Sequence, residues 1–371
     1  MTLRTAVVGG GTVSGVHLDG LRQNPRTTLV AICDTDEDLA RDIADDYGIT
    51  AFFDVEEMLA EADLDWLHIC TPVQTHLPIA KLAIDAGVPV QIEKPITETY
   101  AEFEELAAYA ADHGVTVSEK HNHNFDPAVR AAVAKRRRGE LGDVRGVDVI
   151  YTGSSRPDDP NRGPWNFELA GGEFEEGIPH PLYLTLRVGG YPRSEEAVTA
   201  TTALFGEYDK PFDYDGAQLQ YVTDDEVLCT TKVLGGTRPV RQILIHAENC
   251  SLTVDLLSQT VVEHDRDYKR SAATRALNNV DEAADRLAGT VANARAVARR
   301  ARASDDWDTV RLLNAHFYQN DLESKALLAE DPDQMPVPLS ESRWTSYLME
   351  AVREAATNPP GHPVEQPIES E

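Results

Sequence analysis

The sequence has few features of a membrane, secreted or metal-binding protein. No apolar stretch approaches the roughly 20 residues that a membrane-spanning helix requires, and the first residues, MTLRTAVVGGG, enter a strand-like segment without a hydrophobic signal region. The four cysteines show no metal-ligand spacing; they are Cys33, Cys70, Cys229 and Cys250. We therefore expect a cytoplasmic protein with reduced thiols, no metal site and no membrane association.

Positive charge is also scarce. The 371 residues include 34 lysines and arginines, only eight of them lysine, against 63 aspartates and glutamates, which gives a formal net charge of −29. Such a field repels nucleic acid and anionic membranes, so neither is an expected partner. The acidic residues are spread along the chain, a pattern that predicts a halophilic source in which salt screens their repulsion.

The length favours two domains, and residues 1–120 show a regular alternation of strand and helix patterns. The strand-like segments are 5–9, 27–34, 50–53, 65–72, 88–95 and 115–120. The helical patterns between them begin near Thr12 and then cover 36–47, 55–61, 76–87 and 98–113. This order predicts right-handed βαβ units and a doubly wound parallel sheet of the Rossmann type.

A glycine-rich turn follows the first strand. In GGGTVSGVHLDGL, Gly9 and Gly11 supply two glycines of a G-x-G-x-x-G turn, and Ser14 takes the place of the third. The first glycine permits a tight turn and the second permits close approach of a pyrophosphate, whereas the third position needs only a small residue. The N–H groups of the next helix would face the phosphates.

An acidic residue ends the second strand. Asp34 lies 23 residues after Gly11, where a carboxylate accepts hydrogen bonds from the adenosine ribose hydroxyls of a dinucleotide. It would repel a 2′-phosphate, and the next residues, Thr35 and Asp36, offer no arginine. The sequence therefore favours NAD over NADP.

A lysine stands at the end of the fifth strand, in VQIEKPIT. Glu93 and Lys94 could form an ordinary surface ion pair, or Lys94 could be catalytic. Ligands bind at the carboxyl ends of strands in doubly wound sheets. Gly9, Asp34, Thr71 and Lys94 all belong to that edge, which favours the catalytic interpretation.

These segments together resemble the glucose–fructose oxidoreductase/inositol dehydrogenase (Gfo/Idh/MocA) family. The resemblance rests on VVGGGTVSGVHLDGL, AICDTD, ICTPVQTHLPIAKLAIDAGVPVQIEKPITET and HNHNFDPAV, and it continues more loosely to about residue 350. It implies an NAD(P)-dependent oxidoreductase of sugars or polyols. It also implies a second, α+β domain, residues 121–356, built on an open, mostly antiparallel sheet.

The resemblance assigns roles to individual residues. It places Lys94 beside the nicotinamide and the substrate hydroxyl, His180 as the family's histidine, and Asn122 in the lining of the site. The chain departs from the family at three positions: Asn124 stands where many relatives have arginine, and Glu176 and Tyr183 replace two aspartates. The expected cofactor-binding residues are Gly9, Gly11, Thr12, Val13, Asp34, Thr71, Pro72, His76, Glu93 and Lys94.

The chemistry of alcohol oxidation requires the same two residues. Histidine suits proton removal near neutral pH, and Lys94 would stabilise negative charge on the substrate oxygen. If its segment is helical, Glu176 lies one turn before His180 and would hold the imidazole in one tautomer. Tyr183 would donate to a sugar hydroxyl. Trp165 would either cover the apolar face of a sugar ring or make an ordinary hydrophobic contact.

The second domain is expected to hold a helix at about 127–138, a strand meander from 143 to 265 and a last helix at about 341–356. One face of its sheet would be free for a partner subunit, which predicts a homodimer or homotetramer. In the helical insertion 271–303, apolar residues recur every three or four positions. This stretch would pack on its own domain or a partner, or lie on a membrane surface. The tail 357–371 is predicted to be disordered.

The sequence therefore predicts an NAD-dependent dehydrogenase of a sugar, sugar nucleotide or polyol. Two alternatives stay open. The chain could be an NAD-using glycosidase that oxidises its substrate transiently, or a non-catalytic regulator that binds NAD or a sugar.

Overall fold

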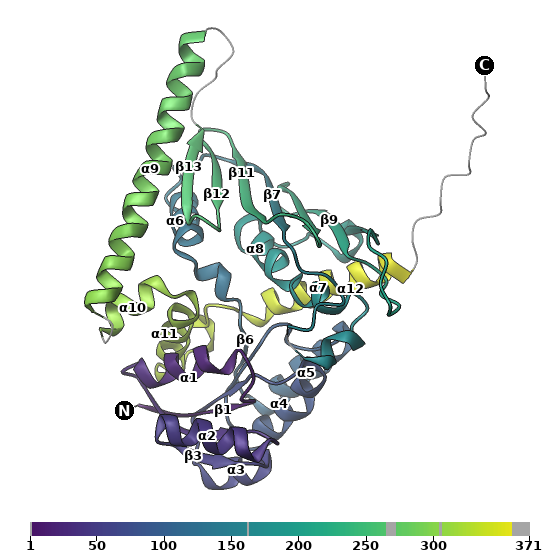
Figure 1. Cartoon of the computed structure of the whole chain (residues 1–371), viewed down its shortest axis with the longest axis vertical. Helices are drawn as coiled ribbons and strands as arrows, with labels where there is room; N and C mark the ends of the chain where they lie inside the picture. Colours follow the sequence, from purple (N-terminus) through teal and green to yellow (C-terminus); the bar gives the residue numbers. More distant parts are fainter. Residues whose placement is uncertain (1, 162, 265–271, 304–305, 358–371) are drawn as a thin grey trace, which may run out of the picture.

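The structure, a computed structural model, describes residues 2–161, 163–264, 272–303 and 306–357. In these residues the chain forms two sheets with their helices, which lie one below the other in Figure 1. The predicted disordered tail lies outside the described residues apart from Thr357. Five short 3-10 helices link the larger elements: Val73–Thr75, Asn122–Phe125, Pro164–Glu168, Glu195–Ala197 and Pro332–Gln334.

Six parallel strands form the first sheet, in the order β3-β2-β1-β4-β5-β6. The strands are β1 (Leu3–Val8), β2 (Thr27–Cys33), β3 (Thr50–Phe52), β4 (Trp66–Ile69), β5 (Val90–Ile92) and β6 (Val117–Glu119). The connecting helices are α1 (Ser14–Gln23), α2 (Glu37–Tyr47), α3 (Val55–Glu61), α4 (His76–Asp85) and α5 (Tyr100–His113). This arrangement confirms the predicted doubly wound sheet.

Local capping fixes where these helices begin and end. The Asp36 and Asp54 side chains accept hydrogen bonds from the first turns of α2 and α3, and Thr99 forms a capping box with Glu102 at the start of α5. Such caps satisfy N–H groups that have no partner within the helix. Helix α5 ends at Gly114, which is left-handed, a conformation that suits glycine.

The second sheet has seven strands in the order β13-β12-β11-β7-β10-β9-β8. Its neighbours are antiparallel except for β7 and β10, which confirms the predicted mostly antiparallel sheet and departs from a simple meander at this one pair. The chain leaves β7, forms two helices and two further strands, and returns beside β7 in the same direction. The strands are β7 (Val144–Thr152), β8 (Thr199–Ala203), β9 (Gly216–Val222), β10 (Leu228–Leu234), β11 (Val240–Ala247), β12 (Ser251–Asp255) and β13 (Thr260–His264).

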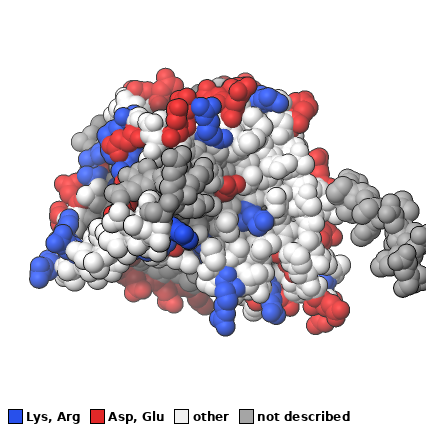
Figure 2. All heavy atoms as spheres, turned by 90° about the horizontal axis from the view of Figure 1, so that it is seen from above, with Lys and Arg blue, Asp and Glu red and all other residues white. Residues whose placement is uncertain are grey.

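Helices cover one face of the second sheet. They are α6 (Pro127–Arg137), α7 (Gly172–Glu176), α8 (Pro179–Gly189) and α12 (Leu339–Thr357). Along β9, Leu219 and Tyr221 point into the core while Gln218 and Gln220 are exposed, as the two-residue period of a strand requires. Figure 2 looks down on this end of the molecule and shows a broad area with few charged side chains, a basic group near its middle among them, bordered by acidic and basic groups.

Two helices near the carboxyl end were not predicted from the sequence: α10 (Trp307–Leu313) and α11 (Ala315–Leu328). Helix α11 contacts the first sheet, where Gln91 on β5 and Lys120 after β6 bond to its side chains. Most of the residues that α11 buries are polar, so it lacks the apolar stripe by which an amphipathic helix is recognised.

The insertion forms one continuous helix, α9 (Ala272–Arg302), rather than a helical pair. It runs along the outer edge of the second sheet, beside β13 (Figure 1). Among the described residues, no helix is both long and apolar enough to cross a membrane.

The position of α11 depends on a buried carboxylate. Asp321, whose side chain is 1% exposed, accepts hydrogen bonds from Arg26 (2.7 Å), Trp307 (2.8 Å) and Lys325 (2.6 Å). These donors come from both ends of the chain. They outweigh the effect of burial, which raises the pKa of Asp321, so the net shift is downward and the carboxylate is charged.

We predict that Asp321→Asn lowers the free energy of unfolding by about 3 kcal/mol, because it leaves the surrounding cations without their counter-ion. Urea denaturation measures this change. The control is Asp308→Asn on α10, whose side chain is 81% exposed and also pairs with an arginine; it should change stability by less than about 1 kcal/mol. Equal effects of the two substitutions would contradict this account of α11.

Candidate active site

A cavity of about 750 Å³ follows the carboxyl edge of the first sheet. It extends from the glycine-rich turn to Lys94, Trp165 and Glu176. All ten residues that the sequence predicts to bind the cofactor line it. Asn122, Asn124, His180 and Tyr183 are not among the residues that line it.

The glycine-rich turn has the form that a bound pyrophosphate requires. Gly9 has a φ of +95°, and a Cβ there would lie 2.7 Å from the carbonyl oxygen of Cys70. A Cβ on Gly11 would meet no atom within 4 Å, so the space over Gly11 is open. Helix α1 begins at Ser14 without a side-chain cap. The N–H groups of Ser14 and Val16 donate to the carbonyl oxygens of Gly11 and Val13, and the positive end of the helix dipole still favours an anion at this turn.

The opposite part of the cavity is acidic. The Asp34 carboxylate accepts from the backbone N–H of Gly10 at 2.6 Å and from that of Asp36 at 2.9 Å, which fixes its position after β2. Asp54 and Glu56 line the cavity as well. Carboxylates suit the hydroxyls of an NAD ribose and repel the extra phosphate of NADP.

His76 ties together two turns at this edge. Its Nε2 lies 2.9 Å from the carbonyl oxygen of Thr71, and its Nδ1 lies 3.0 Å from that of Pro95. Burial lowers the pKa of His76 and keeps the ring neutral, so one of its two nitrogens donates. The peptide bond between Lys94 and Pro95 is cis. His76 thus connects the turn after β4 with the turn that carries Lys94.

Lys94 pairs with Glu176, which the sequence assigned to His180. The ammonium donates to the Glu176 carboxylate and, at 3.1 Å, to the Glu176 carbonyl oxygen. Both side chains are buried, 4% and 5% exposed. The expected helical turn from Glu176 to His180 is interrupted, because α7 ends at Glu176 and α8 begins at Pro179. The lysine is therefore held by the second domain at the end of the cavity.

His180 contacts Tyr183 instead. Its Nδ1 lies 2.7 Å from the Tyr183 hydroxyl, which donates to Oδ1 of Asn122 at 3.1 Å and accepts from the backbone N–H of His123 at 3.2 Å. With its own proton on Asn122, the hydroxyl accepts from Nδ1–H of His180. This series of hydrogen bonds leaves Nε2 as the acceptor nitrogen of the His180 ring, which is the form that a general base needs.

Tyr183 cannot reach a sugar as the sequence suggested, because its side chain is fully buried. His121 lies under it, with ring centroids 4.2 Å apart. Burial lowers the pKa of His121, but Glu119 at 2.9 Å and Glu341 at 2.8 Å outweigh this effect and raise it to about 9. His121 is therefore a charged support for Tyr183.

Asn124 also lies apart from the cavity lining. It is 1% exposed, and its amide donates to Glu341 at 2.7 Å. Asn124 thus joins the polar network around His121, which the sequence did not predict because Glu341 lies more than 200 residues away. The arginine that many relatives have is absent at this position. The Glu341 carboxylate instead binds His121 and Asn124.

A second buried network lies behind the cavity. Nε2 of His17 donates to Glu93 at 2.7 Å, and Nδ1 of His17 lies 2.8 Å from Nδ1 of His68. Burial lowers the pKa of His17, which makes it a neutral donor. Burial also raises the pKa of Glu93, but the hydrogen bond from His17 and the nearby positive groups, Lys94 among them, together outweigh burial, so the net shift is downward and Glu93 is charged. The sequence predicted the position of Glu93 but not its partner.

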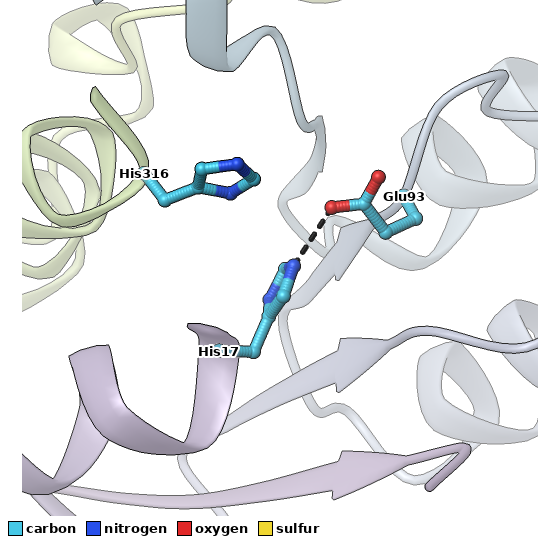
Figure 3. A group of neighbouring side chains, drawn as sticks. All are labelled: His17, Glu93 and His316. Carbon is cyan, nitrogen blue, oxygen red and sulfur yellow. Dashed lines mark hydrogen bonds and ion pairs between the residues drawn. The ribbon is translucent and has the colours of Figure 1, made fainter. Parts of the chain in front are cut away.

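His17, Glu93 and His316 bring potential metal ligands within 4.8 Å of one another (Figure 3). Nδ1 of His316 is buried without a hydrogen-bond partner among the described residues, which would suit a ligand. However, the His17 proton already lies toward Glu93, and the buried ammonium of Lys120 donates to the carbonyl oxygen of His316 at 3.1 Å. A nearby cation disfavours a metal ion, so the cluster fits a hydrogen-bond network better.

Comparison with known proteins agrees with the family resemblance that the sequence motifs indicated. Residues 3–121 match the Gfo/Idh/MocA model, described as an oxidoreductase family with an NAD-binding Rossmann fold. A 4-carboxy-2-hydroxymuconate-6-semialdehyde dehydrogenase of Sphingobium is 30% identical over 148 residues, 40% of this chain and 47% of that protein. An inositol 2-dehydrogenase of Rhizobium meliloti is 30% identical over 222 residues, 56% of this chain and 63% of that protein.

The solved structures extend the likeness to both domains. The WlbA dehydrogenase of Bordetella pertussis, in complex with NADH and UDP-GlcNAcA, has a TM-score of 0.74 at 19% identity and covers 96% of each chain. This likeness shows the fold. The chain spans about half the length of the first curated relatives that it matches, 47% and 46%.

The fold and the glycine-lined cavity define an NAD-binding Rossmann domain. Over residues 3–121 the chain is similar to the Gfo/Idh/MocA oxidoreductase family, the resemblance that its motifs indicated. The roles of the individual site residues, the domain boundaries and the halophilic source stay predictions.

We predict that Gly11→Ala weakens NAD binding by roughly tenfold or more, because the new methyl group occupies the space over which the pyrophosphate lies. Titration calorimetry measures the Kd. The fold should be unchanged, since no atom lies within 4 Å of the added Cβ. Gly15→Ala in α1 is the control, because it is equally unhindered and does not line the cavity. Unchanged affinity of the Gly11 variant would refute this location of the pyrophosphate.

Proposed function

We propose that this chain is an NAD-dependent dehydrogenase that oxidises a hydroxyl group of a sugar, sugar nucleotide or polyol, or catalyses the reverse reduction. The observation that carries the proposal is the placement of Lys94. Its ammonium lies at the end of the glycine-lined cavity, buried with Glu176 and adjacent to Trp165 in the cavity wall. An ammonium held there can donate to a substrate oxygen next to the nicotinamide.

When bound, NAD supplies the hydride acceptor or donor. Lys94 orients the substrate hydroxyl and stabilises the negative charge that develops on its oxygen. Because Glu176 holds the lysine in place, little reorganisation is needed as the charge develops. Trp165 lines the same cavity, and its ring would offer an apolar face to a sugar.

His180 is the proposed proton acceptor. Tyr183 and Asn122 hold its Nδ1 proton, so Nε2 can accept the proton of the substrate hydroxyl. The residue stands near the start of α8, four residues after Glu176, where α7 ends. A substrate that contacts both Lys94 and His180 would therefore lie between the first sheet and α8.

The substrate class is supported by the relatives. Inositol 2-dehydrogenase is named for a polyol, and the WlbA structure holds a nucleotide sugar with NADH. We propose NAD as the cofactor of turnover because of the carboxylates around Asp34. The open face of the second sheet, which carries few charges, would meet a second copy of the chain, giving a homodimer or homotetramer.

The proposal is tested by following absorbance at 340 nm with NAD or NADP and a panel of sugars, polyols and nucleotide sugars, with and without molar KCl. We expect NADH formation with NAD and one substrate class. The Lys94→Met/Glu176→Gln double variant, which leaves no unpaired charge, should bind NAD normally and lose turnover by about a thousandfold or more. Turnover that survives in this variant would exclude the proposed role of Lys94. Release of a sugar without net NADH would identify the glycosidase alternative.

We also predict that Tyr183→Phe lowers kcat by roughly tenfold to a hundredfold with little change in KM, because the Nδ1 proton of His180 loses its acceptor. Steady-state kinetics on the substrate found above gives both constants. Tyr221→Phe is the matched control: its hydroxyl is also buried and donates to a carbonyl, that of Gly190 at 2.8 Å, within the second domain. A rate equal to that of the control would show that Tyr183 does not position the base.

A further inference from the structure

Helix α9 docks on its own chain through polar residues. The Asn293 side chain donates to the carbonyl oxygen of Ser258 at 2.6 Å, and Asp285 accepts from the backbone N–H of Glu263 at 3.0 Å. Gly289 lies against Thr260. These three residues are partly buried, and they share the side of the helix that faces β13.

The apolar residues of α9 lie on the other side. Leu277, Val280, Leu287 and Val291 are 53%, 63%, 65% and 40% exposed. None of the residues of α9 is classed as buried. At 100° per residue, these side chains point roughly opposite to the docking face. Figure 1 shows α9 at the margin of the molecule, with no labelled helix or strand beyond it.

The spacing of this face is that of a coiled coil. We name it the α9 seam and define it as Leu277, Val280, Ala284, Leu287, Val291, Ala294 and Ala298. The intervals alternate between three and four residues, which is the a/d pattern of a heptad repeat. The seam extends for about 32 Å at 1.5 Å per residue. A single surface helix needs no such pattern on the side that faces solvent.

The charges of α9 are divided between its halves. The acidic residues of α9, Asp281, Glu282 and Asp285, all lie in the first half, together with Arg275 and Arg286. The last third carries only positive charge, from Arg295, Arg299, Arg300 and Arg302. A parallel pair would bring like charges together. An antiparallel pair brings the arginine-rich end of one helix to the acidic half of the other and opposes the two helix dipoles.

We propose that the α9 seam pairs in antiparallel fashion with the α9 seam of a second copy of this chain. Pairing of a and d layers in that direction puts Leu287 of each copy against Val291 of the other, at the centre of the interface. The same register brings Asp281 of one copy beside Arg295 of the other, on both sides of the two-fold axis. The alanines at the remaining layers let the helices approach closely.

This interface is separate from the open face of the second sheet. If both faces pair, the two dyads generate a closed tetramer. The proposal does not depend on the proposed function, because α9 contributes no residue to the cavity lining.

The test uses introduced thiols and a short thiol cross-linker on the full chain. The proposed two-fold axis lies midway between Leu287 and Val291, and Ala288 is next to it, so Ala288→Cys should give a cross-linked dimer in high yield. Ala276→Cys is the control. It lies 13 residues from the axis, so the two thiols of an antiparallel pair are about 39 Å apart, whereas a parallel pair would place them at the same level. Both positions are exposed, and the substitutions should leave the fold intact.

A mass measurement completes the test. Leu287→Glu adds a charge to the centre of the seam and should halve the mass found by light scattering, while Asn279→Glu, off the seam, should leave it unchanged. Cross-linking at position 276 instead of 288 would refute the antiparallel register. Equal masses for the two glutamate variants would refute the interface. Binding of wild-type protein, but not of Leu287→Glu, to anionic vesicles without any cross-linking at position 288 would show that the seam meets a membrane instead.

Discussion

The buried ion pair between Lys94 and Glu176 is the contact on which the site depends. Each side chain is about 5% exposed or less, and neither charge could be left alone in such a place without a large desolvation cost. Lys94 follows β5 of the first sheet, and Glu176 ends a helix of the second domain. The pair therefore fixes the Lys94 ammonium at the end of the cavity and ties the two domains together.

The same constraint recurs around the site. His17 with Glu93, and His121 with Glu119 and Glu341, are buried polar groups whose partners come from distant segments. Because buried polar groups are costly unless they are paired, Glu341 specifies how α12 returns to the first sheet, and the bonds from Gln91 and Lys120 do the same for α11. The carboxyl-terminal part of the chain therefore helps to hold the carboxyl edge of the first sheet in place.

This dependence explains what the sequence could and could not predict. The glycine turn, Asp34 and Lys94 are local signals, and the structure places all of them on one cavity. Helix α11 was missed because its buried face is polar and satisfied by tertiary contacts. The prediction paired Glu176 with His180. In the structure Glu176 binds Lys94 and His180 binds Tyr183, because the break between α7 and α8 changes the direction of the chain. The seam of α9 was visible in the sequence, but only the structure shows that it faces away from the body.

The most direct measurement is a crystal structure of the chain with NAD. The account predicts the adenosine ribose at the Asp34 carboxylate, the pyrophosphate over Gly11, and the nicotinamide ring within contact of Lys94 while Glu176 still holds that lysine. NAD bound elsewhere, or bound in the cavity with its nicotinamide away from Lys94, would contradict it.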